Sequence, residues 1–246
     1  MNVILVGALG RMGAHVEEAL RKNGHAVVAR VDIGYGASGG GRYTEIVEVT
    51  EKADVIIDFS FHTVTPAVAR YAARNRLPAV IATTGHTDEE KRMLDEASRQ
   101  TAIFSSGNMS LGIATLCDAV RRVVSAFPDA DVEIVETHHN RKVDAPSGTA
   151  KMLFEAIKEV RPAAIAVEGR SGEGKRMTRE VGISSLRMGN IVGVHEVMIC
   201  TDNERLTLKH EAFDRALFAD GAVKAAEYLC GKPSGRYTMK ELLCDN

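Results

Sequence analysis

The first hundred residues alternate short apolar runs with longer segments of helical periodicity, and this alternation constrains the fold more than any other feature. The apolar runs are rich in β-branched residues and read, in order, NVILVG, HAVVARVD, DVIIDFS, LPAVIATTG and AIFSSGN. Strands that are apolar nearly throughout are buried on both faces of a sheet, and helices between them imply parallel βαβ connections. The pattern predicts an α/β fold with a Rossmann-like, doubly wound parallel sheet over residues 1–108.

The pattern changes after Asn108. A long amphipathic helix over LGIATLCDAVRRVVSAF, a strand over DVEIVETHH and a helix over GTAKMLFEAIKEVR precede sequence that is rich in strands from about Arg176 to Ala212. This composition predicts a second, α+β domain at residues 109–219, built on a mixed or antiparallel sheet. The last helical pattern, DRALFADGAVKAAEYLCG, predicts that residues 220–246 pack back on the first domain.

Three glycines, Gly7, Gly10 and Gly13, lie between the first predicted strand and the first predicted helix. Glycines at such a junction let the backbone approach a pyrophosphate, whose charge is stabilised by the N–H groups of the helix N-terminus. Asp32 ends the second predicted strand, where a carboxylate can accept hydrogen bonds from ribose hydroxyls. The alternative is a glycine-rich turn that serves only helix packing. The strand and helix on either side favour dinucleotide binding.

The residues around Asp32 bear on the choice of cofactor. The carboxylate of Asp32 would repel a 2′-phosphate, and the next residue is Ile33 rather than a base, which favours NADH over NADPH. A positive charge at Arg11 or Arg30 would offset this repulsion, so use of both cofactors stays open.

Charge and cysteine content bear on the class of partner and on location. Lys and Arg number 31 against 33 Asp and Glu, so a formal charge of −2 gives no reason to expect nucleic acid or an anionic membrane, and a small-molecule partner is predicted. The cysteines show no CxxC or zinc-type spacing and are predicted to be reduced thiols in a cytoplasmic protein. Neither a basic leader nor an apolar run of roughly 20 residues is found, so secretion and membrane insertion are not expected.

The segment VETHHNRKVDAPSGTA, residues 135–150, concentrates titratable residues before a helix-starting pattern. In an extended strand, His138 and Lys142 would lie about 13 Å apart, too far to act on one small molecule. The chain must therefore curl, and the segment Asp144–Pro146 breaks the strand. Ser147 is predicted to cap a helix that begins near Gly148.

The start of that helix predicts an anion site. N–H groups at Gly148 and Thr149, with the Thr149 hydroxyl, would hold a carboxylate. An imidazole, with an ordinary pKa near ~6.5, suits proton transfer, and a lysine supplies charge or a proton. A substrate with more than one carboxylate fits this combination. Two alternatives stay open: a helix cap after a polar loop, and, less favoured, a zinc site, because adjacent histidines point apart on a strand. No metal is predicted.

Taken together, these motifs resemble one family, the 4-hydroxy-tetrahydrodipicolinate reductases, also called dihydrodipicolinate reductases, of diaminopimelate and lysine biosynthesis. The resemblance extends nearly from end to end. It is carried by VGALGRMG, VIIDFS, ATTGHT, SSGNMSLGI, VETHHNRKVDAPSGTA, SLRMGNIVGVHEV and FADGAVKAAEYLCGKPSGRYTM.

The resemblance implies residue roles. His138 would be the proton donor or acceptor and Lys142 a proton donor, while His139, Gly148 and Thr149 would bind substrate. The nucleotide-binding positions that it implies are Gly7, Ala8, Leu9, Gly10, Arg11, Met12, Asp32, Ala82, Thr83, Thr84, Ser106, Gly107, Asn108 and Met109. The last two groups follow buried strands, where a doubly wound sheet has its ligand crevice.

This chain departs from the family pattern at a few positions. Ala82 stands where the family usually has glycine, so a methyl group would crowd the cofactor slightly. Met188, Asn190 and Val194 replace a small residue, Asp and Glu in a region that resembles the oligomer-forming sheet of the family. These changes bear on subunit contacts more than on chemistry. The resemblance implies a homotetramer.

The expected reaction is reduction of the cyclic imine dicarboxylate derived from 4-hydroxy-tetrahydrodipicolinate to tetrahydrodipicolinate by NADH or NADPH. Residues 1–108 would then bind the dinucleotide, and residues 109–219 would bind substrate and form the oligomer. A different amino-acid dehydrogenase, such as one acting on aspartate, would share the glycines but not the histidine-lysine cluster joined to Pro-Ser-Gly-Thr. A nucleotide-sensing regulator would need a DNA- or partner-binding surface, and the sequence has no basic helix of that kind.

Overall fold

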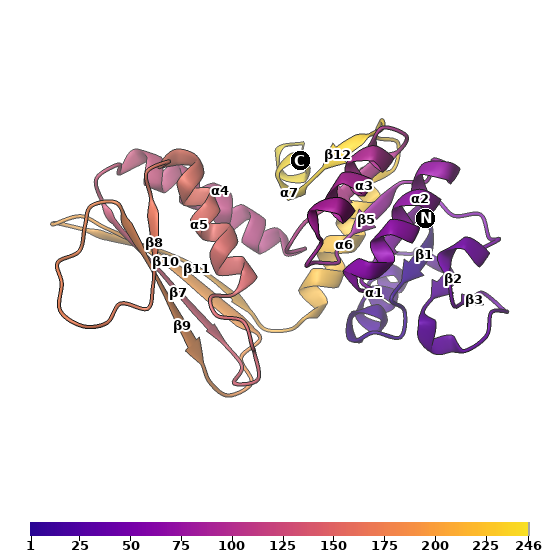
Figure 1. Ribbon diagram of the computed structural model, residues 1–246, viewed down its shortest axis with the longest axis horizontal. Helices are drawn as coiled ribbons and strands as arrows, with labels where there is room; N and C mark the ends of the chain where they lie inside the picture. The colour runs from indigo at the N-terminus through magenta and orange to yellow at the C-terminus, as the bar shows by residue number, and fades with distance from the viewer. Residues whose placement is uncertain (246) are drawn as a thin grey trace. The chain divides into compact units, whose positions relative to one another are not determined.

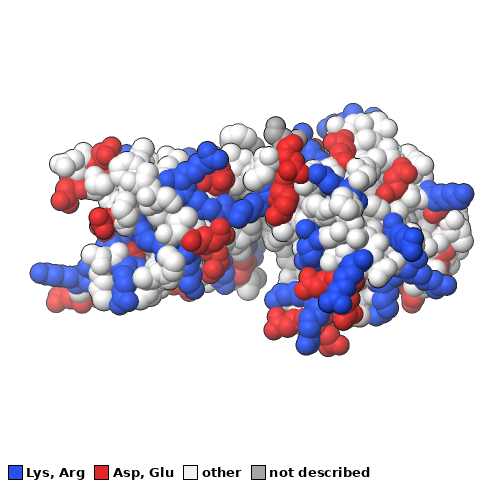
Figure 2. Space-filling model, turned by 90° about the horizontal axis from the view of Figure 1, so that it is seen from above, with Lys and Arg blue, Asp and Glu red and all other residues white. Residues whose placement is uncertain are grey.

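The computed structural model describes residues 1–245, and their contacts group into two compact units (Figure 1). The first unit comprises Met1–Ser110 and the segment that starts at Arg215, and the second comprises Leu111–Asp214. Figure 2 shows basic and acidic side chains interspersed over the visible surface, as a formal charge of −2 suggests. Within residues 1–245 there is no helix both long and apolar enough to cross a membrane.

The first unit is built on a sheet whose described strands run in the order β12-β6-β5-β4-β1-β2-β3, with every neighbouring pair parallel. The strands are β1 (Asn2–Val6), β2 (Ala26–Val31), β3 (Arg42–Tyr43), β4 (Val55–Asp58), β5 (Ala79–Ile81), β6 (Ala102–Ser105) and β12 (Gly235–Tyr237). The helices are α1 (Arg11–Lys22), α2 (Thr65–Asn75), α3 (Asp88–Ser98), α6 (Ala216–Leu229) and α7 (Met239–Cys244), with 3₁₀ turns at Ile33–Tyr35, Ile46–Glu48 and His62–Val64.

Both faces of this sheet are buried, as its strand sequences predict. Ile4 and Val6 of β1 share a core with apolar residues of α2 and α3. Val3 and Leu5 alternate with them, so they point to the opposite face, and they are equally buried. Helices α1 and α6 pack on each other and contact the strands from that opposite face. The chain leaves β1 for β2 on one side and returns to β4 on the other, which makes the carboxyl ends of β1 and β4 a topological switch point.

The second unit is a mixed sheet covered on one face by two helices (Figure 1). Its strand order is β11-β10-β7-β9-β8, with β7 antiparallel to β10 and parallel to β9. The elements are α4 (Leu111–Ala126), β7 (Asp131–His138), α5 (Gly148–Val160), β8 (Ile165–Glu168), β9 (Glu180–Arg187), β10 (Gly193–Cys200) and β11 (Arg205–Ala212). The predicted fold class is confirmed.

The boundary between the units differs from the predicted one at the C-terminal side. The sequence placed it between residues 219 and 220, inside the last long helical pattern. Helix α6 begins at Ala216 and packs along its length on α1, β4, β5 and β6, so the whole helix belongs to the first unit. The functional role of each unit stays a prediction.

Candidate active site

The glycine loop after β1 brings the backbone unusually close to its neighbours. Gly7 has φ of +80°, and a Cβ there would lie 2.6 Å from the carbonyl oxygen of Phe59, which follows β4. A Cβ on Gly13 would lie 2.3 Å from the carbonyl oxygen of Ala8. Gly10 precedes α1, and no side chain of the described residues caps that helix. Gly13 therefore serves helix packing, while the loop and the uncapped N-terminus fit a pyrophosphate.

Asp32 joins the end of β2 to this loop. Its carboxylate accepts hydrogen bonds from the backbone N–H of Leu9 at 2.9 Å and from that of Gly34 at 2.9 Å. Each carboxylate oxygen has a second lone pair, so Asp32 can still accept a ribose hydroxyl. Arg30, by contrast, forms a close ion pair with Glu17, which neutralises its positive charge.

The remaining predicted nucleotide residues follow β5 and β6 at the same edge of the sheet. The N–H of Ala82 donates to the carbonyl of Asp58 at 2.9 Å, and the hydroxyl of Ser106 donates to the carbonyl of Asn108 at 2.7 Å. Because parallel strands end at one edge, the first unit brings all the predicted nucleotide residues to the carboxyl ends of β1, β2, β5 and β6.

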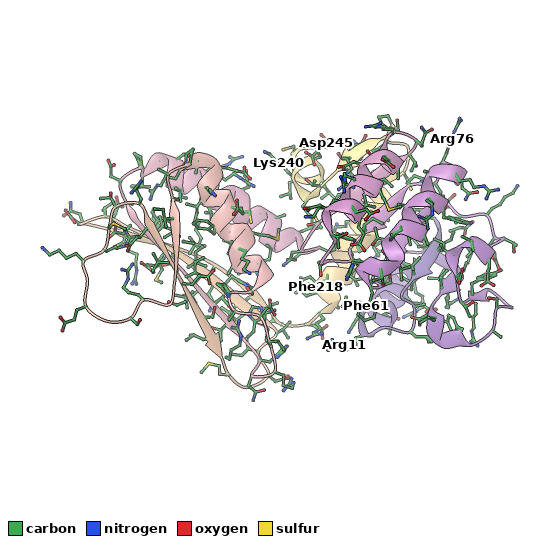
Figure 3. The ribbon with its side chains drawn as sticks, viewed as in Figure 1. Arg11, Phe61, Arg76, Phe218, Lys240 and Asp245 are labelled. Carbon is green, nitrogen blue, oxygen red and sulfur yellow. The ribbon has the colours of Figure 1, made fainter. Side chains whose placement is uncertain are left out.

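The end of β4 adds two residues that the sequence analysis did not single out. Asp58 is fully buried, its Oδ1 accepts from the N–H and hydroxyl of Ser60 at 2.9 and 2.5 Å, and burial raises its pKa. Phe61 follows β4, and its side chain is 79% exposed. Arg11, at the start of α1, is also exposed (Figure 3). Asp58 could have been identified from the sequence, because its carboxylate ends an apolar strand at a switch point.

In the second unit, the chain curls between His138 and Lys142 as predicted, but the strand ends before the segment Asp144–Pro146 that was expected to break it. Strand β7 ends at His138, and the N–H of Lys142 turns back to donate to the carbonyl of His139 at 3.1 Å. Helix α5 begins at Gly148, and the hydroxyl of Ser147 accepts from the N–H of Ala150 at 3.1 Å. The predicted N-cap and helix start are therefore confirmed.

Polar residues continue the apolar rows of the sheet at this end. On β7, Val132 and Ile134 face the helices, and the next residues on that face are Glu136 and His138. On β10 the same change occurs from Val197 to His195. The result is a polar cluster at the strand ends, under the N-terminus of α5.

Glu136 is the centre of this cluster. It is fully buried, and its Oε2 lies 2.5 Å from Nδ1 of His138. The guanidinium of Arg187 donates to both carboxylate oxygens, at 2.8 and 2.7 Å, and the N–H of Ser147 donates to Oε1 at 3.1 Å. Burial alone would raise the pKa of Glu136, but these hydrogen bonds outweigh it and hold the pKa well below the ordinary value.

His195 lies beside His138 with its ring edge-on, the centroids 5.1 Å apart and the planes at 74°. Its Nε2 lies 3.2 Å from the hydroxyl of Ser147. Burial, with the nearby charge of His138 as a second cause, lowers the pKa of His195 to about 3. His195 is therefore neutral near pH 7 and adds no charge to the cluster.

Lys142 lies in the turn that follows, where its Nζ pairs with Asp144 at 2.8 Å. Burial raises the pKa of Asp144, but the hydrogen bond and charge of Lys142, with a backbone hydrogen bond and the charge of Arg187, together outweigh it and leave the pKa lowered. His139 donates its N–H to the carbonyl of Ile191 at 2.8 Å, and Thr149 lies in the first turn of α5. The second unit thus places the predicted substrate and proton-transfer residues at the end of β7, in the turn that follows and in the first turn of α5, and the sequence analysis missed Arg187 and His195.

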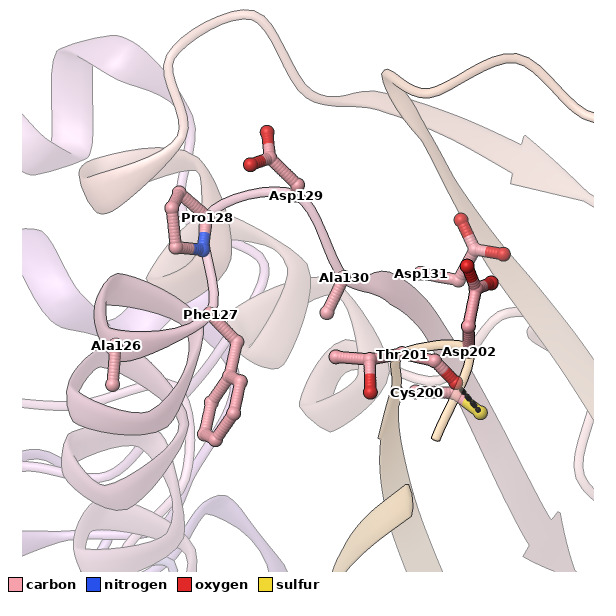
Figure 4. A pocket seen from close by; sticks show the side chains of 9 residues that line it. All are labelled: Ala126, Phe127, Pro128, Asp129, Ala130, Asp131, Cys200, Thr201 and Asp202. Carbon is pink, nitrogen blue, oxygen red and sulfur yellow. Dashed lines mark hydrogen bonds between the residues drawn. The ribbon is translucent and has the colours of Figure 1, made fainter. Parts of the chain in front are cut away.

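A pocket at the opposite end of β7 is separate from this cluster (Figure 4). Three carboxylates line it, from Asp129, Asp131 and Asp202, together with Cys200. Asp131 is already paired with Arg176, at 2.5 Å. Across the described residues, no group of three or more His, Cys, Asp or Glu side chains is arranged to hold a metal ion.

Comparison with known proteins identifies the family. The family model described as dihydrodipicolinate reductase, N-terminus, matches residues 1–109, and the model for the C-terminus matches residues 112–243. A 4-hydroxy-tetrahydrodipicolinate reductase from Caldanaerobacter subterraneus subsp. tengcongensis is 42% identical, over 99% of this chain and 98% of that protein. One from Caulobacter vibrioides is also 42% identical, over 99% of this chain and 97% of that protein.

Solved structures share the fold. A dipicolinate-bound dihydrodipicolinate reductase from Paenisporosarcina sp. TG-14 superposes with a TM-score of 0.81 at 23% identity, over 97% of each chain. An amine dehydrogenase from Mycobacterium smegmatis gives a TM-score of 0.64 at 14% identity, over 97% of this chain and 95% of that one. Since the two family models cover almost the whole sequence and these relatives are 42% identical, the chain belongs to the dihydrodipicolinate reductase family, as its sequence motifs predict.

Proposed function

We propose that this protein reduces the cyclic imine dicarboxylate derived from 4-hydroxy-tetrahydrodipicolinate to tetrahydrodipicolinate, with NADH or NADPH, in lysine and diaminopimelate biosynthesis. Membership of the family supports the activity. The observation in the chain itself that carries the proposal is the buried Glu136–His138 pair beside the N-terminus of α5. It combines a group that transfers protons with a place for a carboxylate.

Proton transfer is assigned to His138. When bound, the reduced nicotinamide supplies the hydride that adds to the β carbon of the conjugated imine. The electron pair of the ring double bond then shifts to give an enamine, and a proton added to the neighbouring carbon restores the imine. One hydride and one proton are consumed in all. Nδ1 of His138 is held by Glu136, so the ring donates as the imidazolium: its Nε2 proton goes to the carbon, and the neutral ring that remains keeps its proton on Nδ1.

Substrate carboxylates are assigned to two places. Gly148 and Thr149, in the first turn of α5, are assigned to one carboxylate, because the positive end of a helix dipole favours an anion. Lys142 holds the second carboxylate by exchanging Asp144, which is 57% exposed, for substrate. His139, which directly follows β7 and precedes Lys142, is assigned to substrate binding as well. Dipicolinate, which the Paenisporosarcina relative binds, is a ring with two carboxylates of this kind.

The first unit is assigned to the dinucleotide, with NADH favoured. The predicted loop residues from Gly7 to Met12 would hold the pyrophosphate and Asp32 the adenosine ribose. The charge of Arg30 is neutralised by Glu17, which leaves the exposed Arg11 as the base that would offset a 2′-phosphate. Residues 82–84 and 106–109 would contact the rest of the cofactor at the ends of β5 and β6.

Assembly and location follow from the family resemblance. We place the protein in the cytoplasm, which the free thiols of its cysteines support, and expect a homotetramer formed through the second unit. Leu186 and Met188, at the end of β9, are half exposed and would be covered in such an assembly. Asn190, one of the departures from the family pattern, accepts a hydrogen bond from Arg141 at 2.5 Å. Native mass spectrometry should give four chains.

Ligand-induced stabilisation tests the proposal. With NADH present, pyridine-2,6-dicarboxylate at about 100 times its Kd should raise the Tm by roughly 5 °C, because a ligand that binds only the folded state stabilises it. Pyridine-2-carboxylate, which has one carboxylate, is the matched control and should give a much smaller shift. An equal response to both ligands, or none to the dicarboxylate, would contradict the two-carboxylate site.

A further inference from the structure

Glu136 joins the parts of the proposed site to one another. Through its two oxygens it contacts the imidazole of His138, the guanidinium of Arg187 and the N–H of Ser147, which caps α5. The register of the strands explains why these side chains meet. Arg187 on β9 pairs with His138 on β7, and His195 on β10 pairs with Glu136. Three neighbouring strands therefore meet at this carboxylate.

We propose that Glu136 is a positioning residue: held on both oxygens by Arg187, it keeps His138 in one tautomer and one orientation, with Nε2 toward the substrate. The proposal deepens the proposed function and rests on it. Neither Glu136 nor Arg187 would touch the reacting atoms; both would act through His138.

The tautomer follows from hydrogen-bond chemistry. An ionised carboxylate only accepts, so the ring nitrogen beside it must carry the proton. The hydrogen bonds from His138, Arg187 and the N–H of Ser147 keep Glu136 ionised despite its burial. Nδ1 of His138 therefore donates to Glu136, and Nε2 is the nitrogen left for exchange with substrate.

The surroundings of Nε2 are consistent with that role. Gly193, at the start of β10, lies against this nitrogen, and a Cβ there would be 3.1 Å from it. Any side chain at position 193 would thus cover the nitrogen that the proposal leaves open. His195 closes another side of the ring without adding charge near pH 7, since burial lowers its pKa to about 3.

Kinetics of Glu136→Gln test the proposal against a matched control. Loss of the carboxylate should lower kcat by about 10- to 100-fold or more, while the KM values for substrate and NADH change by less than about threefold. Glu180 is also buried, lies on β9 and is bound by Arg170 at 2.8 Å, so Glu180→Gln removes a comparable carboxylate–arginine pair elsewhere in the sheet. Its kcat should stay within about twofold of the parent value.

Two further variants keep the test decisive if Glu136→Gln folds poorly. Glu136→Asp keeps the charge but shortens the reach to His138, and Arg187→Lys keeps a cation but loses the two-pronged contact. Both should fold and should lose kcat rather than raise KM. A kcat within about twofold of the parent in these folded variants, or an equal loss in Glu180→Gln, would overturn the proposal.

A spectroscopic measurement separates this proposal from the proposed reaction. In protein labelled with ¹⁵N-histidine, at a pH at which the His138 ring is neutral, its signals, assigned by their absence in His138→Gln, should show the Nδ1–H tautomer, and Glu136→Gln should change that pattern. An Nε2–H tautomer in the parent protein would overturn the positioning role. If the parent protein shows the Nδ1–H pattern but does not turn over the imine, the proposed reaction fails, and what stands is that Glu136 fixes the tautomer of His138.

Discussion

Two histidines on neighbouring strands, His138 and His195, differ in their surroundings although their rings lie 5.1 Å apart. His138 has a buried carboxylate on Nδ1, whereas Nε2 of His195 lies beside the hydroxyl of Ser147. A hydroxyl does not offset the loss of hydration, so burial keeps His195 neutral. At the scale of single residues, His138 is therefore suited to proton transfer, whereas His195 packs in the cluster and makes a neutral hydrogen bond.

His195 predicts a pH dependence of stability. Its pKa is lowered in the folded protein from 6.5 to about 3, so the unfolded chain binds more protons between these values. The stabilisation is fully present above about pH 6.5 and is lost as the pH falls, by about 2 kcal/mol at pH 5. In urea unfolding, the parent protein should lose this amount between pH 7 and pH 5 relative to His195→Gln. Parallel losses in both proteins would show that His195 is not the titrating group.

At the scale of elements, the sequence predicted what is encoded locally. The glycine loop, the break after His138 and the Ser147 cap each depend on a few adjacent residues, and their backbone conformations are as expected. Strand β8, over Ile165–Glu168, was missed because it is short and half exposed. Arg187 and His195 were missed because their roles depend on the pairing of strands about 50 residues apart in the sequence, which one sequence does not reveal.

The cap of α5 should matter for both stability and substrate binding. Ser147→Ala removes the acceptor for Ala150 N–H and the contact with His195, and should cost about 1 kcal/mol of stability. The KM for the dicarboxylate should rise while the KM for NADH stays the same. Thr238→Ala, which removes the cap of α7, is the matched control and should cost stability alone. Equal KM values for the dicarboxylate in both variants would show that α5 does not bind the substrate.

The close packing at the start of α1 should be intolerant of a side chain. In Gly13→Ala the new Cβ would meet the backbone of Ala8 at 2.3 Å, which forces the loop to move and should cost about 1 to 3 kcal/mol. Because the same loop is proposed to hold the pyrophosphate, the Kd for NADH should rise as well. Gly174→Ala, where nothing lies within 4 Å of the added Cβ, should change neither value. An unchanged Kd in folded Gly13→Ala would place the dinucleotide elsewhere.

At the scale of the whole molecule, the parallel sheet and the mixed sheet each end in a cluster of polar groups, and we propose that each cluster binds one reactant. The first presents backbone N–H groups and Asp32 for a dinucleotide. The second presents His138, Lys142 and the start of α5 for a dicarboxylate. The fold class and the family could both be predicted from the sequence, because apolar strand patterns and family motifs occur along almost the whole chain.

The most direct test of the proposed function is the oxidation of NADH with substrate generated in place by the preceding synthase, compared between the parent protein and His138→Gln. The parent protein should consume NADH, and NADPH less efficiently, whereas His138→Gln should lose at least about 100-fold in kcat with an unchanged Kd for NADH. NADH oxidation by His138→Gln at the parent rate would contradict the assignment of the proton donor, and no oxidation by the parent protein with either cofactor would contradict the proposed reaction.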